Sequence, residues 1–268
     1  MQSSHQKQAA RATALMLWTT SLMSSLLMLD ANIMAVSLPA IGRALRASFT
    51  DMQWVISAYL LNKLLANRCI DRSRKGKGKF MLAYVFWHWR QIQTAAKEYE
   101  GRQRAFHAAL AVAPSSGFLR SFSVGLAGAP WAAEGGEAYE DWYCVQDFGA
   151  LGALNEAAVS ASRAAPHAAA ATVAGGGAGG IYRLRSGAVL YTPTYAYWFG
   201  KPEGMSYSEL FAQLTPMVDQ VQAALWMRQM VLGPAREFCM QAVRPVSLPA
   251  WCDALVIPLR PAWPELAH

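Results

Sequence analysis

Hydrophobic positions gather in one long run near the N-terminus and then in short, evenly spaced runs. The first run, Thr13 to Leu29, holds seventeen residues without a charge, and after Asp30 the apolar character resumes as far as Ile41. Together they exceed the ~20 residues that cross a bilayer, so the pattern predicts a transmembrane helix. A secretory signal peptide and a buried helix are the alternatives, although no A-x-A cleavage site follows the run.

The charges around this run predict its orientation. Lys7 and Arg11 precede it, which places the N-terminus in the cytoplasm and the chain in the inner membrane. Asp30 is an intramembrane carboxylate, and such groups normally face a bundle interior or a water-filled path. Because the rest of a bundle is missing from the sequence, we expect Asp30 near the membrane boundary, without a role in transport.

From residue 80 onward the apolar runs are short and alternate with a helical pattern. Aromatic and β-branched runs predict strands, and a 3.6-residue period ended by Pro114 predicts the first helix. Asp147 is a candidate N-cap for the second helix. The glycine-dense stretch Gly175 to Gly180 is interpreted as a flexible connection, not a phosphate-binding loop. The predicted elements are a strand at 80–87, a helix at 94–112, strands at 117–126 and 139–145, a helix at 148–162 and a strand at 181–185.

This β-α-β-β-α-β order is that of a ferredoxin-like unit, and a second copy follows it. The run 194–199 parallels 82–87, and Ser206 with Glu209 forms a candidate capping box for a helix over 206–230. Strands are predicted at 237–243 and 251–259, after which the chain ends without a second α-β finish. The predicted domains are a membrane segment at 1–62, a basic linker at 63–79, a first unit at 80–187 and a second, shorter unit at 188–268.

Composition and charge refine this division. The chain has 268 residues, of which 54% are hydrophobic and only 15% charged, with a net charge of +7. Basic residues concentrate at 68–79, directly after the apolar run and without interleaved aromatics, which favours a solvated linker or a membrane surface over nucleic acid. The four cysteines form no CxxC pair and no zinc spacing, so no metal site is predicted.

One motif in the N-terminal segment resembles a known family. Leu29 to Ile41 (LDANIMAVSLPAI) resembles the first-helix motif of the fourteen-span drug:proton antiporters of the major facilitator superfamily, and 53–61 (QWVISAYLL) resembles the start of their second helix. The resemblance covers residues 10–62. The chain departs from the family where the second helix should continue, and no later run spans a membrane, so it cannot enclose a transport path.

The C-terminal part resembles another family. Two tandem ferredoxin-like units are similar to the dimeric α/β-barrel superfamily, which includes EthD-like proteins, small antibiotic-biosynthesis monooxygenases and haem-handling relatives. This resemblance covers residues 79–262 and rests on the order of elements and the aromatic first strands. It implies a ligand site between sheet and helices, and it carries no functional residue over.

Few polar residues fall where that ligand site would lie. His88 and His107 are the candidate catalytic acid–base residues, with core histidines as the alternative and a haem ligand as a further one for His107. Asp141 and His167 are further polar residues of this region. The candidate pocket residues are Trp87, Tyr99, Arg102 and Trp142, although the tryptophans also suit a core and Arg102 suits a surface ion pair.

The sequence therefore predicts an α+β fold of tandem ferredoxin-like units behind one transmembrane helix. The predicted function is binding of a small hydrophobic molecule, with oxygenase-like or EthD-like chemistry as its catalytic form. A non-catalytic binding or structural protein and a fragment of a drug transporter are the alternatives. The sequence names no cofactor, predicts no nucleic-acid partner, and leaves a homodimer open. The catalytic reading predicts that both histidines open onto one pocket, and the non-catalytic reading that they are buried apart or solvated.

Overall fold

The computed structural model of the protein describes residues 81–126, 128–130, 137–231 and 235–264. The predicted membrane segment, Asp30 and the basic linker lie outside these residues and stay predictions, which sedimentation of the full chain with membranes would test. Within the described ranges, no helix combines the length and the apolar character that crossing a bilayer requires.

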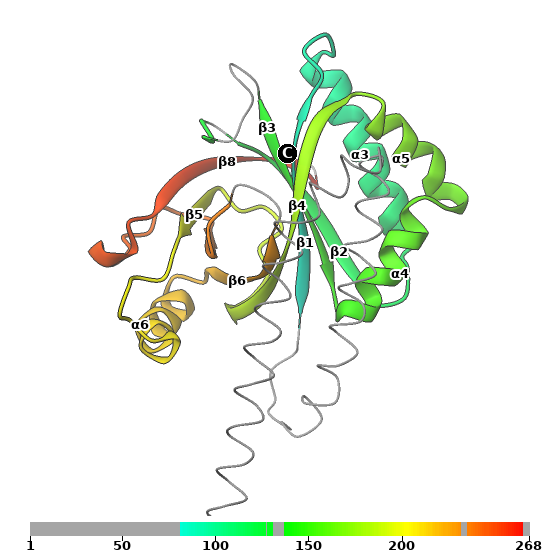
Figure 1. The fold of residues 1–268 in the computed structure, drawn as a ribbon. Coiled ribbons are helices and arrows are strands. Elements are labelled where there is room, and N and C mark those ends of the chain that lie inside the picture. Colours follow the sequence, from blue (N-terminus) through cyan, green and yellow to red (C-terminus); the bar gives the residue numbers. More distant parts are fainter. Residues whose placement is uncertain (1–80, 127, 131–136, 232–234, 265–268) are drawn as a thin grey trace, which may run out of the picture. The chain divides into compact units, whose positions relative to one another are not determined.

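The first unit, residues 82–187, is a four-stranded antiparallel sheet with its helices on one face (Figure 1). Its strands run in the order β4-β1-β3-β2, the ferredoxin-like order, and the predicted β-α-β-β-α-β succession is found. The side chain of Asp147 accepts a hydrogen bond from the Ala150 amide and caps the second helix, as predicted. The elements are β1 (Leu82–Arg90), α3 (Ala96–Val112), β2 (Phe118–Leu126), β3 (Ala138–Val145), α4 (Phe148–Ala158), η1 (Ala161–Arg163), α5 (Ala164–Ala171) and β4 (Ala174–Gly187).

The second unit, residues 195–263, repeats this sheet in the order β8-β5-β7-β6. Its single long helix is stabilised at its start by the predicted capping box of Ser206 and Glu209. Between β7 and β8 the chain forms only a short 3₁₀ helix where the first unit has α4 and α5. The elements are β5 (Tyr195–Phe199), α6 (Tyr207–Gln220), β6 (Ala224–Val231), β7 (Phe238–Ala242), η2 (Ala250–Cys252) and β8 (Leu255–Trp263).

The predicted helix over 206–230 is wrong in its second half. Helix α6 ends at Gln220, and β6 begins at Ala224. Side chains alternate between the two faces of a strand. In β6, Trp226 therefore packs inside the barrel, while Leu225 and Met227 pack against α6. This strand gives the second unit its fourth strand, so the repeat is complete in its sheet.

Two ladders between the units close the eight strands into one barrel. Strand β2 pairs with β8, and β4 pairs with β6, both antiparallel. The barrel interior is filled by aromatic side chains, among them four fully buried tryptophans, while the outer faces of the two sheets pack against α3–α5 and α6 respectively. A single chain thus builds the closed α/β barrel that two ferredoxin-like sheets form by burying one face of each.

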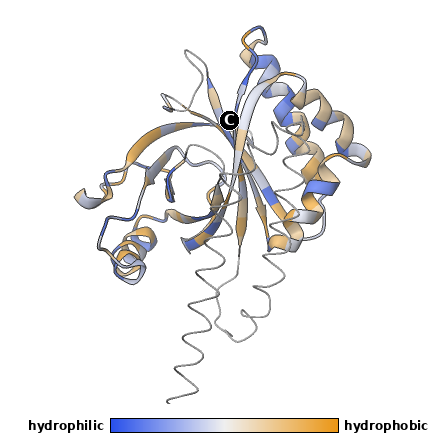
Figure 2. Cartoon of the chain, in the orientation of Figure 1, coloured by the Kyte–Doolittle hydropathy of each residue, from blue (hydrophilic) through white to orange (hydrophobic). Residues whose placement is uncertain are grey.

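The glycine-dense stretch 175–180 is the first half of β4 and not a flexible connection. It pairs with β1 from Trp89 back to Val85, and this half of β4 is pale in Figure 2 because its residues are neither strongly hydrophobic nor hydrophilic. A Cβ at Gly177 would lie 2.4 Å from the Phe86 ring, and one at Gly179 would lie 2.5 Å from the Tyr84 hydroxyl. Glycine therefore leaves room for the aromatic side chains of β1 to lie across the neighbouring strand.

Replacing Gly177 by alanine is expected to destabilise the fold by about 1–3 kcal/mol through overpacking. The new methyl would also lie 2.8 Å from the Trp87 carbonyl oxygen, so a side-chain rotation alone cannot relieve the clash. Gly152→Ala is the matched control, because it lies in α4 with no atom near its Cβ position. It should stabilise the helix by about 0.5–1 kcal/mol. Urea unfolding curves of both variants would contradict the packing argument if they shifted in the same direction.

Candidate functional site

Strand β3 carries two adjacent acidic residues, and both are fully buried. Glu140 and Asp141 expose 0% and 1% of their surface. Because successive side chains of a strand point to opposite faces, Glu140 points into the barrel and Asp141 points toward helix α3. Each carboxylate therefore needs its own set of partners.

Two histidines meet the carboxylate of Asp141 in the layer between sheet and helix. The Nε2 atom of His88, on β1, lies 3.1 Å from Asp141 Oδ2, and Nε2 of His107, on α3, lies 3.3 Å from the same oxygen. All three side chains are at most 1% exposed. We call this group the His–Asp–His cluster.

Hydroxyl groups hold the other ends of the cluster. His88 Nδ1 lies 2.5 Å from the Tyr99 hydroxyl, and His107 Nδ1 lies 2.7 Å from the Ser121 hydroxyl. The Tyr143 hydroxyl donates to Asp141 Oδ2 at 3.0 Å. Every ring nitrogen of the two histidines thus faces a polar atom, in a chain that runs from Tyr99 to Ser121.

Aromatic rings sandwich each imidazole. His88 stacks between Phe86 and Tyr139, with ring centroids 5.2 and 5.7 Å away. His107 stacks between Tyr143 and Trp263, at 5.2 and 6.3 Å. These stacked rings fix the plane of each imidazole and close both of its faces to solvent.

The charges of the cluster explain how it tolerates burial. Burial by itself would raise the pKa of Asp141, but the two histidines hold the pKa of this carboxyl well below its usual range. Burial and the nearby carboxylate raise the pKa of Tyr143 well above its ordinary value, and they raise the pKa of Tyr99 in the same way. Asp141 is therefore the ionised acceptor of the cluster, and both phenols keep their protons.

A narrow crevice lies next to the cluster, between α3, the sheet and the end of β8. Its walls include Tyr139 and Trp263, the two rings that stack on His88 and His107. The crevice is too tight to admit a water molecule between its walls, so a ligand can enter only if side chains at the rim move. It is lined by Glu100, Gln103, Arg104, Ser123, Tyr139, Ala262 and Trp263.

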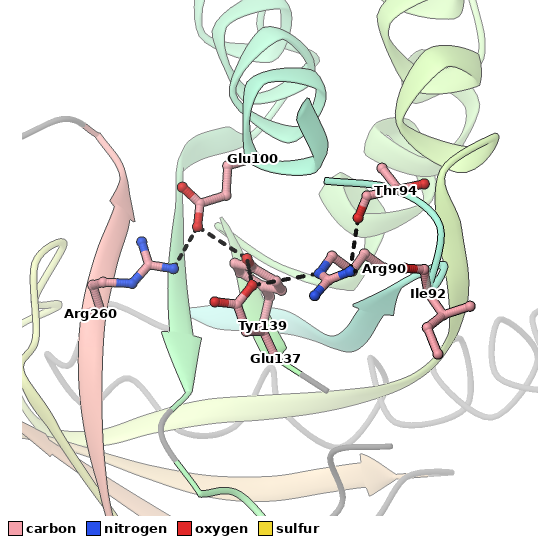
Figure 3. Close-up of polar contacts among 7 residues, drawn as sticks. All are labelled: Arg90, Ile92, Thr94, Glu100, Glu137, Tyr139 and Arg260. Carbon is pink, nitrogen blue, oxygen red and sulfur yellow. Dashed lines mark hydrogen bonds and ion pairs between the residues drawn. The ribbon is translucent and has the colours of Figure 1, made fainter. Parts of the chain in front are cut away.

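Two residues of the crevice wall, Glu100 and Tyr139, belong to a network of charged and polar side chains that extends to Arg260 and Arg90 (Figure 3). Glu100 of α3 lies between Arg260 of β8 and the Tyr139 hydroxyl, at 2.5 and 3.0 Å. The Tyr139 hydroxyl also contacts Glu137 at 3.3 Å, and Glu137 pairs with Arg90 at 3.6 Å. The ion pair of Arg260 with Glu100 connects the second unit to the first directly over the crevice.

A second buried acid occupies the barrel interior. The indole N–H groups of Trp87 and Trp142 donate to the two oxygens of Glu140, each at 3.1 Å, and the Trp198 indole lies close enough to act on the pKa of this carboxyl as well. Burial raises the pKa of Glu140 to about 7, and the indole hydrogen bonds only partly oppose this rise. We call Glu140 with these three indoles the tryptophan cage.

The structure separates the predicted pocket residues into three places. His88, His107 and Tyr99 lie together in the cluster, whereas Trp87 and Trp142 face the barrel interior on the other side of the sheet. Arg102 points away from the cluster and joins α3 to α5, through the Ala169 carbonyl, Thr172 and an ion pair with Glu98. Hence one predicted pocket containing all of them does not form.

The sequence left two expectations for the histidines: that both open onto one pocket, or that they are buried apart or solvated. Neither describes them fully. They lie in one cluster, and not apart, but neither opens onto a pocket. The polar residues singled out from the sequence included Asp141 but gave it no partners, and they left out Ser121, Tyr143, Glu100 and Glu140. The pair Glu140-Asp141 inside an otherwise apolar strand was the available signal, because alternation sends one acid to each face.

The site does not suit a haem or a metal ion. Both nitrogens of His107 are engaged, by Ser121 and Asp141, and the ring is closed between two aromatic side chains, so this histidine does not fit an axial haem ligand. Across the described ranges, no group of three or more His, Cys, Asp or Glu side chains is placed to hold a metal ion.

Comparison with known proteins gives a likeness of fold only. No family model matches the chain, including its permease-like residues, and no curated protein matches it. A candidate monooxygenase from Lactobacillus acidophilus is 9% identical, with a TM-score of 0.44 over 68% of this chain and 94% of that one. A candidate monooxygenase from Fusobacterium nucleatum is 10% identical, with a TM-score of 0.43 over 62% and 76%. A chlorite dismutase mutant from Candidatus Nitrospira defluvii is 10% identical, with a TM-score of 0.36 over 72% and 96%.

Proposed function

We propose that this α/β-barrel protein binds a small hydrophobic ring compound in the crevice and exchanges a proton with it through the Tyr99 hydroxyl, which contacts His88 of the His–Asp–His cluster and Gln103 of the crevice wall. The observation that carries the proposal is that two aromatic side chains belong to the crevice and to the surroundings of the cluster at the same time. Tyr139 and Trp263 line the crevice, and each also stacks on one histidine of the cluster. A ligand between these rings would lie one aromatic ring away from each imidazole.

The polar lining supports an acid–base role. Gln103 lies one helical turn before His107 on α3, and it forms a hydrogen bond with Tyr99, which contacts His88. Ser123 lies two residues after Ser121 on β2, and therefore on the same face of the sheet. Of the crevice lining, Gln103 is thus connected to the cluster through Tyr99, and Ser123 shares the sheet face of Ser121. We propose oxygenase-like or EthD-like chemistry as the catalytic form of this function, with the side chains of the cluster as acid and base.

Binding of 2-naphthol tests the proposal, because this probe is flat, hydrophobic and carries one acidic hydroxyl. We expect saturable binding by calorimetry, with an absorption spectrum of the bound probe shifted toward the naphtholate form. Ala262→Leu should lower the affinity at least tenfold by filling the crevice, whereas Ala168→Leu on the exposed face of α5 should not change it. His88→Gln should remove the spectral shift and keep most of the binding, while His167→Gln, outside the cluster, should keep both.

The outcomes separate the alternatives. Binding without a spectral shift would make the chain a non-catalytic binding protein. No binding, or equal binding by the Ala262 variant, would leave the cluster as a structural device that fixes α3 on the sheet.

A further inference from the structure

Glu100 is the carboxylate of the crevice wall on which several polar groups converge, and Glu137 lies on the other side of the Tyr139 hydroxyl, 3.3 Å away. Glu100 receives the guanidinium of Arg260 and the hydroxyl of Tyr139 on one oxygen, and Arg104 lies 4.0 Å from the other. Burial by itself would raise the pKa of Glu100, but the hydrogen bonds and charges of these groups lower it below the usual value. Two cations and one hydroxyl donor therefore converge on one acidic position.

The position of Arg260 depends on a glycine of the neighbouring strand. A Cβ at Gly125 of β2 would lie 2.9 Å from a guanidinium nitrogen of Arg260. With glycine at this point, the arginine lies across β2 and reaches Glu100 on α3. The guanidinium stays about half exposed, whereas the Glu100 side chain is only 14% exposed, so solvent approaches the pair from the side of Arg260.

The carboxylate at this position is supplied by a side chain of α3. Glu100 is the only acid that an ion pair places on Arg260 among the described residues. A ligand whose ring enters between Tyr139 and Trp263 would carry any substituent at its outer end to this same point. Exchange of one carboxylate for another keeps the charge-assisted hydrogen bonds, which are the strong ones at such a site.

We infer that the ligand of the crevice is an anionic ring compound, an aromatic carboxylate, whose acidic group replaces Glu100 between Arg260, Arg104 and the Tyr139 hydroxyl. This inference rests on the proposed binding function and specifies its ligand class. The ring lies between the aromatic walls, its inner end faces Gln103 and Ser123, and its carboxylate closes the rim. In the protein without ligand, the carboxylate of Glu100 itself occupies the position where the ligand carboxylate binds.

Two isosteric probes test the inference on the full chain. We expect 2-naphthoate to bind at least tenfold more tightly than the uncharged 2-naphthylmethanol, measured by calorimetry at pH 7. Arg260→Gln should lower the affinity for naphthoate at least tenfold and leave that for the alcohol within twofold. Arg236→Gln is the matched control, because Arg236 is also a partly exposed arginine paired with one acid, Asp253, but lies away from the crevice.

The Glu100→Gln variant gives the sharpest readout. It removes the competing charge, so naphthoate should bind several-fold more tightly than to the native chain, while the alcohol should not respond. A merely structural role of the ion pair would weaken both probes in both variants. Circular dichroism of each variant shows whether its fold is intact.

The result that overturns the inference differs from the one that overturns the proposed function. Equal affinity for both probes, unchanged in Arg260→Gln, would leave the crevice as a binding site and remove the anion position. Absence of binding by both probes, or binding that Ala262→Leu does not affect, would remove the site itself.

Discussion

Replacing Asp141 by asparagine is expected to lower the free energy of unfolding by about 3 kcal/mol or more. The substitution keeps the size of the side chain but removes the negative charge that two buried histidines and Tyr143 share. Removing the ionised acceptor of a buried ionic network is strongly destabilising, because the remaining buried groups lose the partner that compensated their burial. Urea unfolding followed by far-ultraviolet circular dichroism at pH 7 would measure it.

The difference between native and variant should depend on pH in one direction. The folded-state pKa of Asp141 lies below its unfolded value of 3.8, so its contribution is present above about pH 4 and is lost as the pH falls. The stability difference between native chain and variant should therefore shrink toward acid. Asp147→Asn is the matched control, because asparagine caps a helix as well as aspartate does, and it should change stability by at most about 0.5 kcal/mol. Equal stability of both variants would mean that the cluster holds no net ionic interaction.

The sequence predicted the first unit well because its elements are locally determined. Its strands are short aromatic runs bounded by turn residues, and Pro114 and Asp147 mark helix ends by backbone chemistry alone. Strand β6 was missed because the segment after Gln220, Leu225 to Met230, also fits a continuing amphipathic helix. Its pairing with β4 and β7 decides the outcome, and this information comes from residues far away in the chain.

The sequence pointed to some members of the site but not to the others, and not to its geometry. His88 and His107 are nineteen positions apart on a strand and a helix, and only the register of β1 against β3 brings His88 beside Asp141. Trp87 adjoins His88 and Trp142 adjoins Asp141 in the sequence, yet adjacent residues of a strand point to opposite faces. The crevice wall Trp263 comes from the second unit, so barrel closure was needed to place it.

The tryptophan cage around Glu140 gives the last prediction, in which stability falls as the pH rises. The pKa of Glu140 is about 7 in the folded chain, compared with 4.5 for the ordinary value. The folded state therefore holds this proton more tightly, and its ionisation on going from about pH 4.5 to about pH 7 should cost about 3 kcal/mol of stability. Below that range the acid is neutral in both states and carries no such penalty.

The Glu140→Gln variant should be less stable than the native chain at acidic pH and more stable than it at alkaline pH. Glutamine stays uncharged, but its NH₂ group cannot accept from an indole, so one hydrogen bond to Trp87 or Trp142 is lost at a cost of about 1 kcal/mol. The native chain should then be the more stable one at pH 4, and the variant the more stable one at pH 8. Glu156→Gln, on the exposed face of α4, removes a like charge without contacting the cage and serves as control. Parallel stability curves for the native chain and Glu140→Gln across this range would mean that the carboxylate is solvated, and that the barrel interior is open to water where the structure closes it.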